Sequence, residues 1–186
     1  IDPTYEDDFN QWYDREHMEE RVAIDGFQWA RRYRNISNSD RRYLALYRTK
    51  NIGTFTTPSY QKAFQNQTEW SNTNFGRMIN TKRRVMHVDQ EAGFGSGAVV
   101  ALIMLPSSDL DFDVIAPVLK TISKIDGVLA SHCMSPDEAL STPLPSEDVS
   151  ARSLEAAIVI DATSIDAASA AANIMRDQLK LSADRN

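Results

Sequence analysis

The feature that most constrains the fold is a short motif that occurs twice in the chain, 101 residues apart. Ile24-Asp25-Gly26-Phe27 follows one amphipathic helical pattern, and Ile125-Asp126-Gly127-Val128 follows another. In each copy the glycine supplies the left-handed residue that commonly ends a helix, and strand-forming residues come next. The motif therefore predicts two halves that share a helix–turn–strand core.

The hydrophobic patterns on either side of the motif extend this repeat. In the first half they predict a helix over 8–25, strands over 27–36 and 41–50, short helices ending at Phe64 and spanning 70–78, and a strand over 82–89. In the second half they predict a strand over 98–105, a helix over 109–125, a strand through Cys133, a strand over 154–162 and a helix over 165–179.

Each half is thus a piece of a ferredoxin-like β-α-β-β-α-β unit, and the predicted class is α+β. Glycines at 93, 95 and 97 mark a flexible joint, so we expect one repeat over 1–95 and a second over 96–186. Neither the first strand of repeat one nor the last strand of repeat two is found. Since such gaps would expose sheet edges, we expect these terminal strands to lie outside the chain shown.

Charge and aromatic residues are distributed unevenly between the halves. The net charge of -6 argues against a nucleic-acid partner, although residues 1–95 hold 14 basic against 13 acidic side chains and residues 96–186 hold 6 against 13. Of the 16 aromatic residues, 15 precede position 96. Aromatic rings are typical of small-molecule pockets, so the first half is the expected site. The alternative is a core that happens to be rich in aromatic residues.

Two further features bear on location. Cys133 is the single cysteine, which predicts neither a disulfide framework nor a thiolate metal site and favours a cytoplasmic setting. No apolar run approaches the roughly 20 residues that cross a bilayer, so no membrane partner is expected. The chain begins at Ile1 and not at a methionine, so the sequence is compatible with an N-terminal segment that has been removed.

The first predicted helix carries the best candidate for chemistry. Trp12, Tyr13 and His17 share a face that is unusually polar for a buried stripe. Tyr13 lies one turn before His17, and Glu16 and Glu20 are close enough in sequence to orient an imidazole, which is the arrangement that proton transfer needs. The alternative is a helix histidine capped by a neighbouring carboxylate or by solvent.

The repeat provides an internal comparison for this face. At the 101-residue offset, Tyr13 corresponds to Val114 and His17 to Val118. If these positions served only to pack against a sheet, valine would suffice in the first half as well. The comparison favours a functional role for Tyr13 and His17.

The strand that follows offers three arginines as partners for a substrate anion. Alternation places Arg31 with Trp29 and Tyr33, and Arg32 with Arg34, so one of the two sets faces the helix. Arg31 is the predicted clamp because of its aromatic neighbours. The predicted substrate-binding residues are Trp12, Trp29, Tyr43, Tyr47 and His87. For His87, the alternative is a histidine exposed to solvent on a strand.

No metal centre is predicted. His17 lacks a second histidine at metal-ligand spacing. His132 and Cys133 could suggest a nucleophile and its base, but they are adjacent on a predicted strand, where neighbouring side chains point to opposite faces, which argues against the pair.

The string FNQWYDREHMEERVAIDGFQWARRYR, followed by RRYLALYRT, resembles a largely uncharacterised group of dimeric α+β barrel proteins related to the EthD-like proteins. The resemblance covers residues 8–50 and is most specific in its W-Y-D-x-E-H core. The positions that match are Trp12, Tyr13, Asp14, Glu16, His17, Arg21, Gly26, Phe27, Arg31, Arg32, Tyr33, Tyr43 and Tyr47.

This resemblance implies two ferredoxin-like units that pair sheet to sheet into a barrel, here fused within one chain, with a pocket between sheet and helices. Whether the fused chain also forms a homodimer is a question that the resemblance leaves open. Members of the superfamily include cofactor-free monooxygenases, muconolactone isomerases, polyketide cyclases and haem enzymes, and fold alone does not choose among them.

The leading functional hypothesis is a cofactor-independent lyase or isomerase that acts on a small aromatic or carbonyl-containing molecule. His17 would be the general base or acid, Tyr13 the donor to a developing oxyanion, and Arg31 the clamp on a carboxylate or enolate. The alternative is a non-catalytic protein that binds a small molecule or acts as an accessory. A cofactor-free monooxygenase or a haem protein is the third hypothesis.

Overall fold

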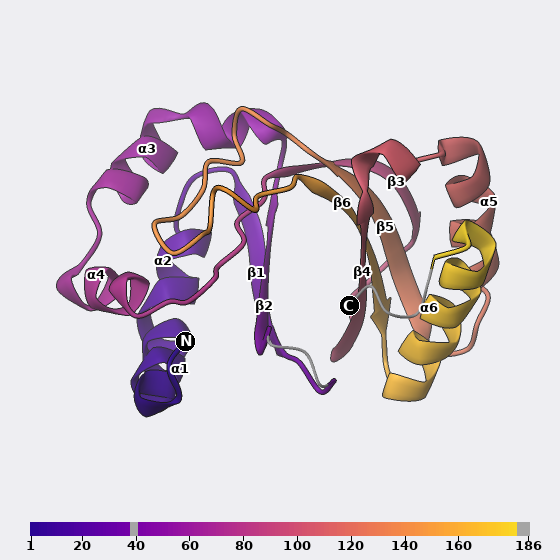
Figure 1. Ribbon diagram of the computed structural model, residues 1–186, viewed down its shortest axis with the longest axis horizontal. Helices are drawn as coiled ribbons and strands as arrows, with labels where there is room; N and C mark the ends of the chain where they lie inside the picture. The colour runs from indigo at the N-terminus through magenta and orange to yellow at the C-terminus, as the bar shows by residue number, and fades with distance from the viewer. Residues whose placement is uncertain (38–40, 182–186) are drawn as a thin grey trace. The chain divides into compact units, whose positions relative to one another are not determined.

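The computed structural model describes residues 1–37 and 41–181 and has an α+β fold (Figure 1). The chain divides into two compact units. The first unit comprises residues 1–84 and 139–152, and the second comprises residues 85–138 and the chain from Ser153 onward. Each unit builds an antiparallel sheet and packs helices against it.

The first unit is a two-stranded ribbon with helices on one side (Figure 1). Strands β1 (Phe27–Arg34) and β2 (Tyr43–Thr49) pair antiparallel. Its helical elements are η1 (Pro3–Tyr5), α1 (Glu6–Trp12), η2 (Tyr13–His17), α2 (Met18–Val22), η3 (Ile52–Thr56), α3 (Pro58–Gln65) and α4 (Glu69–Gly76). Because an isolated two-stranded ribbon is marginally stable, contact with these helices is what holds it in place.

The second unit is a four-stranded antiparallel sheet in the order β3-β5-β6-β4. Its strands are β3 (Met86–Gly93), β4 (Val99–Pro106), β5 (Val128–Pro136) and β6 (Glu155–Ala162), and its helical elements are η4 (Ser107–Asp109), α5 (Phe112–Ile122) and α6 (Ile165–Leu179). Figure 1 shows α5 and α6 side by side against this sheet. Between them lies an apolar core that includes Ile103, Leu119, Ile158 and Met175.

The repeated motif forms the same turn in both units. Gly26 and Gly127 adopt positive φ angles of 95° and 88°. The carbonyl of Gly26 accepts a 2.8 Å hydrogen bond from the amide of Lys50, at the end of the neighbouring strand. The carbonyl of Gly127 accepts one of the same length from Thr163. The predicted change from helix to strand at each Asp-Gly is confirmed.

The predicted boundary at residue 95 is wrong. β3 was expected to close the first half, but it pairs with β5 in the second unit. The segment 93–97 therefore joins two edge strands of one sheet instead of joining two halves. Which sheet edge a strand joins depends on hydrogen bonding to a distant partner, and the hydrophobic period of the strand does not record it.

The loop at 139–152 was expected in the second half but belongs to the first unit. Arg84 and Glu147 form an ion pair of 2.7 Å, and their side chains are only 6% and 5% exposed. Arg83 also donates to the carbonyl of Leu140 at 2.7 Å. A buried pair of this kind costs several kcal/mol when one partner is removed, so it fixes the loop to the first unit.

The buried face of α5 includes only one of the two valines that were compared with Tyr13 and His17. Ile115, Val118, Leu119 and Ile122 are buried, whereas Val114 is 40% exposed. Val114 therefore does not show that a buried valine suffices at the position of Tyr13, whereas the buried Val118 does show this for the position of His17.

Throughout the part of the chain that the structure describes, helices are too short or too polar to cross a bilayer.

We predict that Gly26→Ala destabilises the first unit by about 1–3 kcal/mol. At φ 95° a side chain is strained, and a Cβ would lie 2.7 Å from the side chain of Thr54, which is itself buried. Gly76→Ala is the matched control, because no atom lies within 4 Å of its Cβ and its φ is ordinary.

Urea unfolding followed by tryptophan fluorescence measures this effect, since Trp12, Trp29 and Trp70 all lie in the first unit. The control should shift the free energy of unfolding by no more than about 1 kcal/mol. Equal stability of the two variants would contradict the assignment of strain to Gly26.

Candidate functional site

A single widened turn interrupts the first long helix and shapes the site. Helix α1 passes into η2, a π-helical turn in which the amide of Met18 bonds the carbonyl of Tyr13, and continues as α2. Residues five apart point about 140° apart on an ordinary α-helix, at 3.6 residues a turn. Here the rings of Trp12 and His17, five residues apart, lie 4.4 Å from each other. The π turn is what brings them into contact, and such turns are frequent at functional sites.

His17 is enclosed by aromatic rings. In addition to Trp12, the rings of Tyr13, Phe75 and Tyr47 lie 5.0, 5.7 and 6.4 Å from its imidazole, and the residue is 6% exposed. Its Nδ1 is buried without a hydrogen-bond partner. A buried polar atom left unpaired is costly, and in a native site it calls for an explanation.

Burial and two neighbouring cations keep this histidine neutral. Loss of solvation, together with the charges of Arg21 and Arg32, lowers the pKa of His17 from 6.5 to about 3. At neutral pH the ring therefore offers one donor and one acceptor nitrogen. The Glu16 carboxylate does not serve as its orienter as expected, because it accepts hydrogen bonds from Thr68 at 2.5 Å and Ser71 at 3.3 Å.

Two tyrosines beside His17 are kept in the protonated form. Burial raises the pKa of Tyr13, while the Tyr47 hydroxyl and, less strongly, the charges of Arg32 and Arg21 oppose the shift. Burial also raises the pKa of Tyr47 well above its ordinary value, and the adjacent Tyr13 hydroxyl raises it further. Both phenols are thus hydrogen-bond donors at neutral pH, next to a neutral imidazole.

Arg32 reaches the helix from β1 and is held on several sides. It donates to Asn10 at 2.6 Å and lies 3.9 Å from a carboxylate oxygen of Asp14. Its guanidinium stacks over the rings of Tyr13 and Tyr43 at 4.3 and 4.1 Å, and over Phe9 at 5.0 Å. Stacking of this kind over several rings is favourable and fixes the orientation of the group.

The predicted orientation of Arg31 is therefore reversed. Arg31 lies over the ring of Trp29 at 4.9 Å, and the contacts with the helix are made by Arg32 on the other face of β1. The prediction relied on aromatic neighbours within the same strand. The rings that surround Arg32 come instead from the helix and from β2, which sequence alternation does not show.

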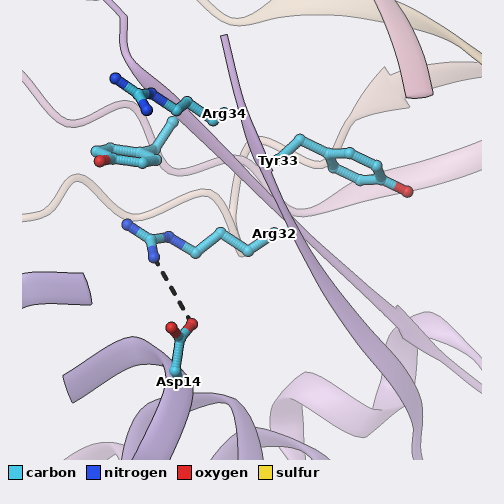
Figure 2. Close-up of a pocket in the computed structure, with 5 residues that line it drawn as sticks. Asp14, Arg32, Tyr33 and Arg34 are labelled. Carbon is cyan, nitrogen blue, oxygen red and sulfur yellow. Dashed lines mark ion pairs between the residues drawn. The ribbon is translucent and has the colours of Figure 1, made fainter. Parts of the chain in front are cut away.

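A pocket of about 150 Å³ opens at the Arg32 end of this cluster. It is lined by Asp14, Arg32, Tyr33, Arg34 and Tyr43. Figure 2 shows Arg32 and Arg34 extending to the same side of β1, with Asp14 approaching Arg32 from the helix and Tyr33 pointing away. Tyr13 lies between this pocket-lining arginine and His17.

The structure brings some of the predicted residues together and separates others. In the first unit, Tyr13 and Tyr43 contact Arg32, and His17 contacts Tyr13 and Tyr47. Trp12 is fully buried, with its indole N–H donated to Ser71 at 3.0 Å, so it supports His17 from the core and does not line the pocket.

Trp29 and His87 were also expected to contact substrate, and the structure places them elsewhere. Trp29 shares the face of Arg31. His87 lies on β3 of the second unit, where it pairs with Asp137 at 3.2 Å.

Two other expectations concern Cys133 and metal ions. Cys133 is fully buried, and burial raises the pKa of its thiol to about 11, so it stays protonated. Among residues 1–37 and 41–181 there is no group of three or more His, Cys, Asp or Glu side chains placed to hold a metal ion.

Phe75, Ser71 and Asn10 were not anticipated. Phe75 and Ser71 come from α4, more than 50 residues from the helix that they contact, and only the tertiary fold brings them there. Asn10 had a weak signal, since it lies one turn before Asp14 on the same helix face.

Comparison of the chain with protein-family models, with curated proteins and with solved structures finds no match.

We predict that His17 makes the first unit sensitive to mild acid. Because its folded-state pKa lies below the unfolded value, its contribution to stability is present above pH 6.5 and is lost as the pH falls toward 3. Between pH 7 and pH 4.5 the loss is roughly 2–3 kcal/mol.

The measurement is urea unfolding at both pH values for the parent and for His17→Gln, which does not titrate. The difference between the two pH values should be smaller in the variant by roughly 2–3 kcal/mol. Since each protein serves as its own reference, a general loss of stability in the variant does not affect the test. Equal pH dependence in both proteins would show that His17 is not held neutral.

Proposed function

We propose that the first unit is an enzyme that performs acid–base chemistry on a small aromatic or carbonyl-containing molecule, as a lyase or isomerase. One observation carries the proposal: the buried, neutral His17, with Nδ1 unpaired, lies against Tyr13, which lies in turn against an arginine of a pocket. A base or acid, a hydrogen-bond donor and a cation in line are the groups that enolisation requires.

The roles follow from position and charge. Arg32 is fixed by Asn10 and by stacked rings, so it can stabilise an enolate or carboxylate without reorganising. Tyr13, protonated and partly exposed, would donate to the oxygen on which negative charge develops. His17, whose ring packs edge to face against that of Tyr13, would be the general base or acid. A neutral imidazole of lowered pKa is a form that enzymes use to polarise carbonyl oxygens.

A second candidate is a protein that binds the same molecule without converting it. The specific observation in its favour is the burial of His17 behind Tyr13, since the imidazole does not line the pocket. In that case Tyr13, Tyr43 and Arg32 would serve recognition, and His17 would only complete an aromatic core.

We also propose that both units are ferredoxin-like and belong to the EthD-related group. In the second unit β4, α5, β5, β6 and α6 follow the order of the first five elements of a β-α-β-β-α-β unit, with matching turns at Gly26 and Gly127 in support. The W-Y-D-x-E-H string around Tyr13 and His17 supports the relationship to that group.

We predict that Tyr13→Phe and His17→Gln retain binding but lose turnover. The experiment screens the parent by thermal shift against small aromatic acids, lactones, quinones and phenols, and follows each hit by mass spectrometry. Because positioned proton transfer contributes at least about 100-fold to rate, each variant should convert a hit at least about 100-fold more slowly, at similar affinity.

Tyr5→Phe is the matched control, since Tyr5 is 41% exposed in η1 and its ring lies under Arg77, outside the pocket. It should convert the hit at the parental rate. Hits that bind the parent and both variants equally, with no conversion by any of them, would replace the enzyme proposal with the binding candidate.

A further inference from the structure

The pocket beside Tyr13 carries more positive than negative charge. Arg32 and Arg34 line it, with Asp14 as the acidic residue of the lining. Asp14 is a weak counter-ion, because its side chain is 72% exposed and lies 3.9 Å from Arg32. Glu6 does not compensate, since it is already bound by Arg42 and by the Tyr43 hydroxyl, each at 2.6 Å.

Both arginines have donors to spare. The Nη1 of Arg32 lies 3.9 Å from Asp14, too far for a hydrogen bond, while its Nη2 donates to Asn10. Arg34 makes no hydrogen bond and no ion pair within the described residues, and its charge acts on Glu6 only at longer range. Two guanidinium groups on one face of a strand, one of them held in place, form a ready receptor for an anion.

We propose that this pocket is an anion subsite that takes the carboxylate of a small organic acid, held between Arg32 and Arg34. The proposal rests on the proposed function, because it names the substrate class of the same site: the acid would present its reacting carbon to Tyr13. The volume, equal to about five water molecules, suits a carboxylate with a small attached group. A planar carboxylate also matches the fork of a guanidinium.

Binding of an acid would also change His17. The groups that act on its imidazole are Arg21 of α2, Arg32 of β1, and the phenols of Tyr13 and Tyr47. Burial is the largest cause of the lowered pKa of His17, and the charges of the two arginines are the next. A carboxylate on Arg32 offsets one of these charges and so makes His17 more basic when substrate is present. The anion subsite would thus couple substrate binding to the availability of the base.

Isothermal titration calorimetry at low salt tests the subsite. The probes are benzoate, its neutral analogue benzamide, and inorganic phosphate. The variants are Arg34→Gln and Arg31→Gln, which remove the same charge from opposite faces of β1. Arg34 is exposed, so its replacement leaves the packing intact, and a thermal melt verifies this.

Benzoate should bind the parent and Arg31→Gln equally, and Arg34→Gln at least about tenfold more weakly. Benzamide should bind at least about tenfold more weakly than benzoate. Equal binding of benzamide, or no effect of Arg34→Gln, would overturn the proposal. Phosphate bound more tightly than benzoate would overturn the assignment to a carboxylate.

The outcomes for this subsite and for the enzyme proposal are separable. If benzoate binds through Arg34 and no acid in the screen is converted, the subsite stands and the acid–base function falls. If neutral carbonyl compounds are converted while benzoate fails to bind, the function stands and the subsite falls.

Discussion

The contact of Arg32 with the first helix is the interaction on which the candidate site depends. One side chain from β1 meets Phe9, Tyr13 and Tyr43 with its guanidinium face, and Asn10 with one of its nitrogens. It therefore joins helix, β1 and β2 into one layer, and it also places a fixed positive charge near His17. Packing and electrostatics of the site come from the same residue, so neither can be altered without the other.

The π turn is the second constraint, and it explains why the histidine is neutral. By turning Trp12 onto His17, the widened turn encloses the imidazole among rings that provide no hydrogen-bond acceptor for Nδ1. A charged ring would be poorly solvated there, and the nearby arginines add repulsion. The neutral form persists with an unused polar atom, which is the kind of local cost that folded proteins retain at functional sites.

The helix–turn–strand elements were predictable because their signals are local. Gly26 and Gly127 both needed a positive φ, and the sequence shows this as glycine after a helical stripe. Partnership between distant elements was not predictable: β3 joined β5, and Glu147 joined Arg84, across separations that no hydrophobic period encodes. In the candidate site, the contact between Tyr13 and His17 was predicted from one helix face. Arg32 was missed in favour of Arg31 because the deciding contacts are tertiary.

The most direct measurement of the central claim is the protonation state of His17, read from ¹⁵N NMR of the histidine rings between pH 7 and pH 4. The His17→Gln variant assigns its signals against those of His87 and His132. A neutral pattern that persists to pH 4 is the result expected for a pKa of about 3. Titration of His17 with a midpoint near 6.5 would contradict the account, because the imidazole would then be solvated and outside the field of Arg21 and Arg32.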